Sequence, residues 1–292
     1  MKLTILGSGT AVPLLDRNCA GYLLEINNTR ENQSVVSEFG EISERKGAFA
    51  FDSSLASHRF SVPRKFKKFS REKLLFDSGA GTIRRLLELK INLFDIDNLF
   101  YTHLHNDHIN DLGAIIWSNN YGGIRKNPLN LYGPKGLKQY YNILVKKLLK
   151  PAKINFKINV KELTKSAVKI KNITVKTNEI RHSITTKSIA YRIKHQNKTL
   201  VYAGDAEYCN EVIEVAMNAD ALLIECSFPD NKRIKGHLTP SLAGKIASKA
   251  KVKRLILTHF YPEALKADIK KQCKKRFKGE VILAKDKMKI NL

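Results

Sequence analysis

Apolar residues in this chain fall into short runs and helical patterns that alternate along most of its length. A short apolar run closed by glycine or polar residues indicates a strand, whereas apolar positions spaced by three or four indicate an amphipathic helix. Up to residue 152, the expected strands are residues 2–7, 20–26, 74–76, 99–102 and 129–132, and the expected helices are residues 82–89, 112–119 and 137–149. Trp117, within one of these helices, is expected to lie in the core.

The remaining pattern begins with residues 153–201, where short alternating segments with few helix signals predict a run of antiparallel strands. Strands are then expected at residues 220–224, 254–257 and 281–283, with helices at residues 240–250 and near 263–273. Strand and helix therefore alternate on both sides of an antiparallel stretch. This order fits an α/β fold with two mixed β-sheets flanked by helices better than one all-parallel sheet.

A polar segment interrupts the pattern between Asn27 and Lys73. It begins with the polar run Asn-Asn-Thr-Arg-Glu-Asn-Gln and later contains the basic, Phe-interleaved stretch Arg59–Arg71. Because apolar order resumes on both sides, we interpret it as an insertion in a single domain that spans residues 1–292. The basic stretch either contacts RNA or covers a sheet edge, and the sequence leaves both interpretations open.

Composition narrows the class of protein. With 292 residues and 43% hydrophobic residues, the chain can bury a full core. No apolar run reaches the roughly 18–20 residues of a membrane-spanning helix, and the first ten residues read as a strand rather than a signal peptide, so we expect a cytoplasmic protein without a membrane partner. The four cysteines form no C-x-x-C pair, which argues against a disulfide framework and against a cysteine-based zinc site.

The net charge of +25 and the pI near 9.9 point to a polyanionic partner. Such a field attracts a phosphate backbone by Coulomb steering and by release of counterions. Nucleic acid is therefore the leading class of partner. A proteome that is rich in lysine throughout would produce the same bias, so charge alone does not decide.

The clearest chemical signal is His103-Leu104-His105-Asn106-Asp107-His108, directly after an expected strand. Imidazole nitrogens and carboxylate oxygens bind Zn²⁺ at roughly 2.0 to 2.2 Å, and a loop can converge side chains that are this closely spaced, whereas a helix cannot. Three of the eight histidines of the chain lie in these six residues. We predict a metal-binding loop here; the alternative is a solvated polar loop.

Three further candidate ligands each follow an apolar strand: His182, Asp205 and His259. Taken singly, each is more often structural than catalytic. Together with the histidine-rich loop, they supply the number of ligands that two metal ions require.

These residues resemble the metallo-β-lactamase superfamily, and within it the ribonuclease Z-like group of tRNA 3′-processing enzymes. The superfamily pattern is matched by Asp77, His103–His108, His182, Asp205 and His259. The features of the group are Leu6–Thr10 with Pro13, Arg17 and Asn18, then Phe76–Thr82, Leu131–Gly136, Glu225–Phe228, Gly236–Thr239 and Leu257–Phe260. The resemblance covers most of the chain and implies an αββα sandwich.

The resemblance also implies a ligand set for two Zn²⁺ ions per chain, with Mn²⁺ as an alternative metal. One ion would be held by His103, His105 and His182, the other by Asp107, His108 and His259, with Asp205 bridging them and Asp77 behind the ligands. Two such ions lower the pKa of a bridging water and clamp the oxygens of a phosphodiester. Asp107 would orient the nucleophile and accept a proton, while a protonated His237 would donate to the leaving 3′-oxygen or stabilise the equatorial oxygens. The alternative for His237 is a surface imidazole beside a helix N-terminus. Thr239, before Pro240, is a candidate helix cap.

The substrate implied is precursor tRNA, cut on its 3′ side, and the group is homodimeric. The long arm that many ribonuclease Z proteins use to grip tRNA would fall between the helix at 137–149 and His182, where no arm-like segment is found. The lysines of this span either bind phosphates or solvate exposed strands. Two alternatives therefore stay open: a hydrolase of small or cyclic phosphodiesters with the same dinuclear site, and a nucleic-acid-binding module without activity.

Overall fold

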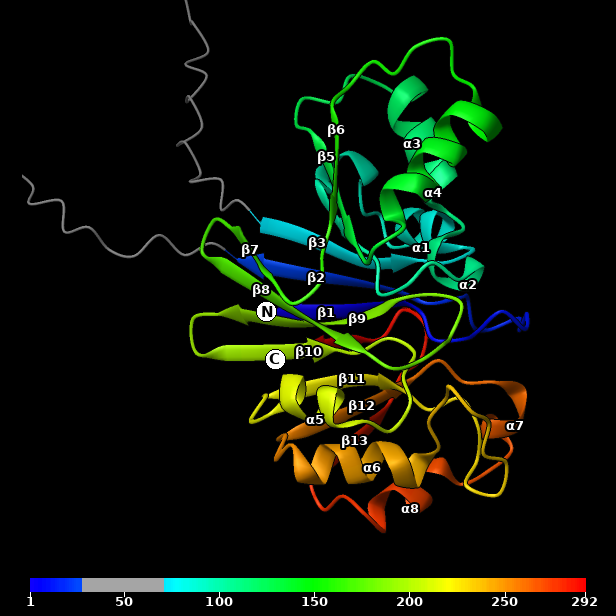
Figure 1. The fold of residues 1–292 in the computed structure, drawn as a ribbon, viewed down its shortest axis with the longest axis vertical. Helices are drawn as coiled ribbons and strands as arrows, with labels where there is room; N and C mark the ends of the chain where they lie inside the picture. The colour runs from blue at the N-terminus through cyan, green and yellow to red at the C-terminus, as the bar shows by residue number, and fades with distance from the viewer. Residues whose placement is uncertain (28–70) are drawn as a thin grey trace, which may run out of the picture.

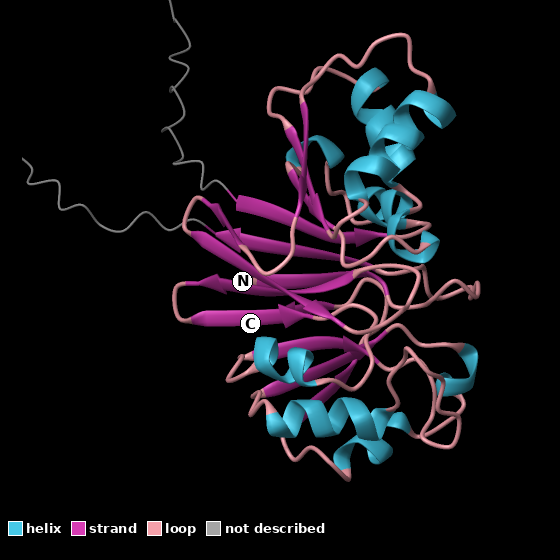
Figure 2. Ribbon diagram, in the orientation of Figure 1, coloured by secondary structure: helices cyan, strands magenta, loops and turns pink. Residues whose placement is uncertain are grey.

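The computed structural model describes residues 1–27 and 71–292. They form two mixed β-sheets that pack face to face, with helices on the outer side of each sheet (Figure 1, Figure 2). The first sheet has the strand order β14-β1-β2-β3-β4-β5-β6, and the second has the order β13-β12-β11-β10-β9-β8-β7. The predicted αββα arrangement is confirmed.

The first sheet comes from residues 2–162, except for its edge strand β14 at the C-terminal end. Its strands are β1 (Lys2–Gly7), β2 (Gly21–Asn27), β3 (Arg71–Ser78), β4 (Asn98–Phe100), β5 (Leu129–Gly133), β6 (Ile158–Glu162) and β14 (Lys289–Asn291). Its helices are α1 (Thr82–Glu88), η1 (Leu93–Asp95), α2 (Asn106–Ile109), α3 (Leu112–Tyr121), α4 (Leu137–Ile143) and the π-helical η2 (Leu144–Leu149). Strands β3 to β6 are parallel neighbours, so their carboxyl ends share one edge.

The second sheet holds β7 (Ala167–Ile170), β8 (Ile173–Ile180), β9 (Ser188–His195), β10 (Lys198–Tyr202), β11 (Ala221–Glu225), β12 (Arg254–Thr258) and β13 (Glu280–Leu283). Its helices are α5 (Asn210–Ala216), α6 (Pro240–Lys249), α7 (Pro262–Leu265) and α8 (Ile269–Lys274). Strands β10 to β13 are parallel, whereas β7 to β10 pair antiparallel. Side chains after β10 and β12 therefore emerge at one edge.

Aromatic rings fill the space between the sheets. Phe76 and Phe100 from the first sheet stack at 5.0 Å, and Tyr191 from the second sheet meets both at 5.5 and 5.4 Å. Tyr22 and Tyr202 contact each other across the same layer at 4.9 Å. Because these rings are almost fully buried, they fix how the two sheets sit against each other and hence the edge where both end.

Several sequence-based expectations differ from the structure. Residues 153–201 are not one antiparallel run, because β6 pairs parallel with β5 in the first sheet. The single helix expected near 263–273 is two helices, since the Asp268 side chain accepts a hydrogen bond from Lys271 N and caps a new start. The segments α5 and β14 were not predicted.

Trp117 is not a core residue, which corrects the expectation above. It is 43% exposed and packs against the Tyr121 ring in a tilted arrangement, with the ring centroids 4.7 Å apart. The predicted insertion at 27–73 lies almost entirely outside the described residues, apart from Asn27, which ends β2, and residues 71–73, which begin β3. Among the described residues, no helix combines the length and the apolar character that crossing a membrane requires.

Candidate metal centre

The predicted metal ligands meet at the edge where strands from both sheets end. His103 follows β4, His182 follows β8, Asp205 follows β10 and His259 follows β12. Asp107 and His108 belong to α2, a single helical turn, whereas the sequence predicted a loop without helix. The four side chains can still converge, because only Asp107 and His108 lie on the turn, while His103 and His105 precede it and His105 has extended backbone.

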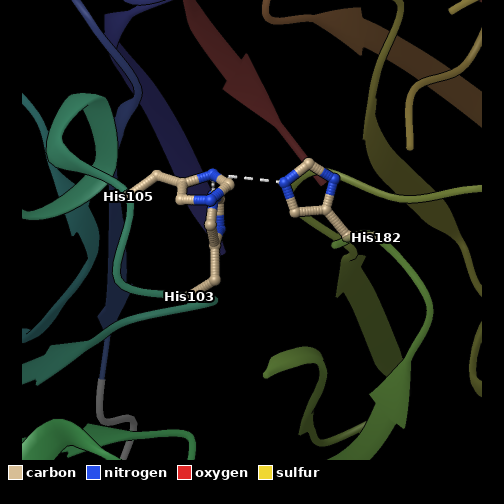
Figure 3. Close-up of side chains that lie close together, drawn as sticks. All are labelled: His103, His105 and His182. Atoms are coloured by element: carbon tan, nitrogen blue, oxygen red, sulfur yellow. Dashed lines mark hydrogen bonds between the residues drawn. The ribbon is translucent and has the colours of Figure 1, made fainter. Parts of the chain in front are cut away.

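Three imidazoles form the first group of possible ligands. The Nδ1 atom of His105 lies 3.0 Å from His103 Nε2 and 3.2 Å from His182 Nε2 (Figure 3). His103 is fully buried, while the other two are partly exposed. Three ring nitrogens that face one point at this spacing suit a single cation with nitrogen ligands.

The second group consists of Asp107, His108 and His259. His259 Nε2 lies 3.2 Å from His108 Nε2 and 3.2 Å from Asp107 Oδ2. Each of the three residues offers one donor atom, and these atoms lie within 4.8 Å of one another. This group therefore also has the composition and spacing of a zinc site.

Asp205 lies between the two groups. Its Oδ1 atom is 3.4 Å from the Nε2 atoms of both His108 and His259, and its Oδ2 atom is 3.9 Å from His182 Nε2. The residue is 3% exposed, and among the described residues Oδ1 has no hydrogen-bond partner. A buried carboxylate oxygen without a partner is costly, and a cation shared by both groups would compensate it.

Hydrogen bonds orient the imidazoles so that unprotonated nitrogens face the centre. His182 Nδ1 donates to Gly236 O at 2.7 Å, and His108 Nδ1 donates to Asp77 Oδ2 at 2.8 Å. His259 Nδ1 donates to Ser227 Oγ at 3.1 Å, because the Ser227 hydroxyl itself donates to Glu225. When these rings are neutral, this arrangement leaves a lone pair on each Nε2 atom, which is the form that binds a metal. The residues present therefore fit a pair of divalent cations.

Asp77 supports the centre from behind without reaching it. It is 1% exposed, and besides His108 its carboxylate accepts hydrogen bonds from Thr102 N, Thr102 Oγ1 and Tyr202 Oη at 2.8, 2.8 and 2.5 Å. Tyr202 belongs to β10 and Thr102 follows β4, so this carboxylate ties the two sheets together beside the candidate ligands. Its backbone φ of 52° lies in the left-handed region, as does that of His259 at 57°. Such strain in residues other than glycine is concentrated at functional sites.

The backbone around Asp107 is held by a close approach of the turn after β3. A Cβ atom on Gly79 would lie 1.9 Å from Asp107 O and 2.6 Å from Cys19 Cβ. Only glycine fits between these two segments. The turn that the sequence analysis noted as part of the resemblance therefore packs directly against α2.

His237 stands at the edge of the candidate centre, half-buried, and pairs with a carboxylate. Its Nδ1 atom lies 3.1 Å from both oxygens of Glu225, and 3.9 Å from Asp205 Oδ2. Glu225, which ends β11, is fully buried and also accepts from Ala206 N and from Ser227. Glu225 and Ser227 belong to a motif of the resemblance, but no role could be predicted for them, because a lone acid at a strand end carries no spacing signal.

Burial and charge act against each other in this centre. Burial lowers the pKa of His103 well below its ordinary value, because the charged ring would lose hydration. For His237, burial also favours the neutral ring, but the charge of Glu225 outweighs it and raises the pKa to about 9. For Asp107, burial favours the neutral acid, but the interaction with the His259 ring outweighs it and lowers the pKa to about 2. At neutral pH, His237 is therefore a proton donor and Asp107 a carboxylate.

One ambiguity in the ligand set is visible in the geometry. Donor atoms of His182, Asp205, Glu225 and His237 also lie within 4.8 Å of one another. His237 is thus close enough to the candidate ligands to act either as a ligand or as a proton donor. Thr239 occupies the cap position of α6 with Pro240 after it, as predicted, but its side chain makes no capping hydrogen bond.

Comparison with known proteins agrees with this geometry. The family model for the β-lactamase superfamily domain matches residues 72–260, which contain all the candidate ligands. The chain is 26% identical to ribonuclease Z of Brevibacillus brevis over 243 residues, or 64% of this chain and 75% of that protein. The metallo-β-lactamase fold protein YhfI of Bacillus subtilis is 22% identical, with a TM-score of 0.73 over 99% of this chain and 98% of that chain. The short form of human tRNase Z is also 22% identical, with a TM-score of 0.69 over 100% of this chain and 99% of that chain. The chain belongs to the β-lactamase superfamily and is a metal-dependent hydrolase of the ribonuclease Z-like kind.

Proposed function

We propose that this protein is a dinuclear zinc phosphodiesterase that cleaves precursor tRNA on its 3′ side. The observation that carries the proposal is the convergence of His103, His105, Asp107, His108, His182, Asp205 and His259 at one edge, with the Nε2 lone pairs of at least three rings turned inward. The similarity to ribonuclease Z of Brevibacillus brevis supports the substrate class. The net charge of +25 favours a polyanionic substrate.

The chemistry divides between the ions and the side chains. Two Zn²⁺ ions would supply a water of lowered pKa and positive charge for the phosphate oxygens. Asp107 is charged at neutral pH and is the partly exposed member of the second group, where it orients the attacking water and accepts its proton. Mn²⁺ is compatible with the same mixed nitrogen and oxygen ligands.

His237 completes the proposal on the side of the leaving group. Glu225 holds its Nδ1 atom, so Nε2 is the ring nitrogen that is available to donate. A pKa of about 9 keeps this proton in place at neutral pH, and the proton passes to the departing 3′-oxygen. The 3′-hydroxyl leaves on the upstream strand, and the phosphate stays on the 5′ end of the trailer.

A defined precursor tRNA with a 3′ trailer tests this proposal. Zinc-loaded protein is incubated with it, and both product ends are mapped at single-nucleotide resolution. Cleavage that leaves a 3′-hydroxyl on the tRNA is expected, and it should stop on chelation and return when zinc or manganese is restored. Absence of cleavage at full metal occupancy would contradict the proposed substrate.

A second candidate function is hydrolysis of small or cyclic phosphodiesters at the same centre. It is favoured by the span between α4 and His182, which forms η2, β6, β7 and β8, all packed within the fold, and contains no protruding arm. In the same assay, turnover of a small chromogenic phosphodiester without cleavage of precursor tRNA would select this alternative.

For the tRNA-cleaving enzyme we also propose a cytoplasmic homodimer, with sedimentation of the full chain as the test of its assembly.

A further inference from the structure

Beyond His237, the surface has two adjoining hollows that the proposed mechanism does not use. The first has a volume of about 300 Å³ and is lined by His237 itself, with Tyr208, Arg233 and Lys235. The second has a volume of about 310 Å³ and is lined along α6 by Lys245 and Lys249, with Arg276 from the segment after α8. Helix α6 lies on the outer side of the second sheet (Figure 1).

Tyr208 connects the two hollows. Its ring lines the first hollow, and it is also the platform for the two lysines of the second, whose Nζ atoms lie 5.0 Å (Lys245) and 5.9 Å (Lys249) from the ring centroid. An aromatic face attracts ammonium groups and so holds two like charges close together. We call Tyr208, Arg233, Lys235, Lys245, Lys249 and Arg276 the basic strip.

The charge of the basic strip is not neutralised within the part of the chain that is described. None of its five cationic side chains forms an ion pair within 4.0 Å with a described residue, whereas the neighbouring Lys232 pairs with Glu263 at 2.7 Å. Among the described residues, Glu207 is the one carboxylate that lines either hollow, and it already accepts a hydrogen bond from Gly236 N at 2.8 Å. Cations of one sign along a hollowed surface bind a phosphate backbone.

We propose that the basic strip binds the RNA nucleotides on the 5′ side of the cut, the strand that keeps the 3′-oxygen. This inference rests on the proposed function, in which His237 donates its proton to that oxygen. Since His237 lines the first hollow, the strand bearing this oxygen leaves the centre past Tyr208 and toward α6. Lys245 and Lys249 then contact its phosphates, and the trailer departs on the other side of the centre.

The test compares the two product strands as inhibitors. One is an RNA oligonucleotide with the upstream sequence and a 3′-hydroxyl; the other is the trailer with a 5′-phosphate. Each is titrated against zinc-dependent hydrolysis of a small chromogenic phosphodiester, in the native chain and in a double variant, Lys245→Ala with Lys249→Ala. The control variant, Lys271→Ala with Lys275→Ala, removes two exposed lysines of the same spacing on and just after α8 that line neither hollow.

The Lys245/Lys249 variant should raise the inhibition constant of the upstream strand about tenfold. The slope of its logarithm against the logarithm of salt concentration should become shallower by about 1.4, the value for two phosphate contacts on a single strand. The trailer constant, the turnover of the small ester and the melting temperature should not change, and the control should behave like the native chain. An unchanged upstream constant, or an equal rise for both strands, would overturn the proposal.

Failure of the strip and failure of the proposed function give different results. If the native chain cleaves precursor tRNA but the double variant binds the upstream strand normally, only the strip is wrong. The opposite result is that the native chain does not cleave precursor tRNA, while the double variant still binds the upstream strand more weakly and the trailer normally. The basic strip is then a binding site for RNA, and the proposed tRNA substrate is wrong.

Discussion

The two halves of the candidate centre are built in different ways. The N-terminal donors, His103, His105, Asp107 and His108, lie within six residues after one strand. The C-terminal donors, His182, Asp205 and His259, come from three separate strand ends of the second sheet. Local backbone geometry arranges the first set, whereas the second set meets only when the pairing of β8 to β12 is correct.

The positions of the two sets of donors therefore depend on different parts of the structure. The N-terminal donors are fixed by a buried carboxylate, Asp77, and by the close approach of Gly79 to Asp107. The C-terminal donors are fixed by sheet register and by long-range hydrogen bonds such as that from His182 to Gly236 O. Substitutions in the first set should therefore act on the chemistry directly, and many substitutions in the second should act through the fold.

The largest effect is expected for Asp107→Ala among the N-terminal donors. It removes a candidate ligand and the proposed proton acceptor together, so turnover should fall by at least about 10³-fold, and metal content should drop below two per chain. Steady-state kinetics and metal analysis measure both. Asn106→Ala, at the exposed neighbouring position, is the control and should stay near native activity. Full activity in Asp107→Ala would contradict the assignment.

His237→Ala probes the opposite side of the centre. Turnover of precursor tRNA should fall about 10²-fold, since the leaving oxygen loses its proton donor, while metal content stays near two per chain. The loss should be smaller for a chromogenic ester whose leaving group needs no proton. Loss of a metal ion instead would make His237 a ligand, as its position beside His182 and Asp205 also allows.

Asp77→Asn tests whether the Asp77 carboxylate, behind the N-terminal donors, holds His108 in place. The amide cannot accept all four hydrogen bonds that the carboxylate receives, so His108 loses the partner that fixes its ring. The affinity for one of the two metal ions should fall about 10- to 100-fold, with the fold retained. Competition with a chromogenic chelator measures the metal affinity, and unchanged affinity at both sites would show that Asp77 does not support metal binding.

The smallest effect is expected for Gly204→Ala, next to Asp205. Gly204 has φ of 61°, and a Cβ atom there would lie 2.7 Å from Thr102 Cβ. The free energy of unfolding should fall by about 2 kcal/mol, because of the left-handed backbone and the crowding. Gly113→Ala is the control, since its Cβ atom meets only ordinary contacts at 3.4 and 3.6 Å inside α3. Equal denaturation midpoints for the two variants would show that the β10 end tolerates change.

The features that could be predicted from the sequence are those encoded by residues close together in the chain. Dense histidines, glycine turns and apolar strands are local patterns, so the segment 103–108 and strands such as β1 and β12 could be predicted. Trp117 could not be placed, because Ile115, Ile116 and Trp117 are apolar in succession and such a run does not indicate which side of a helix faces solvent. Glu225 acquires its role only through a contact with His237, and Tyr202 only through its reach to Asp77.

Long-range pairing explains the remaining differences. The sequence of β6 reads as a strand, but nothing in it states that its neighbour is β5 rather than β7. The three residues of β14 carry almost no pattern of their own and are ordered by pairing with β1. Propensity and alternation describe single segments, whereas these assignments depend on segments far apart in the chain.

The pairing of β14 with β1 has a consequence for how the enzyme is made. Asp286, just before β14, accepts hydrogen bonds from Ser8 N, Ser8 Oγ and Asn18 N, and it binds Arg85 at 2.8 Å. During translation, strands β1 to β6 of the first sheet leave the ribosome long before these residues do, so β1 still lacks its β14 partner and the loop after β1 lacks its contacts with Asp286. A nascent chain stalled before residue 286 should therefore be cut by protease in the segment between β1 and β2, and should become protected there on release.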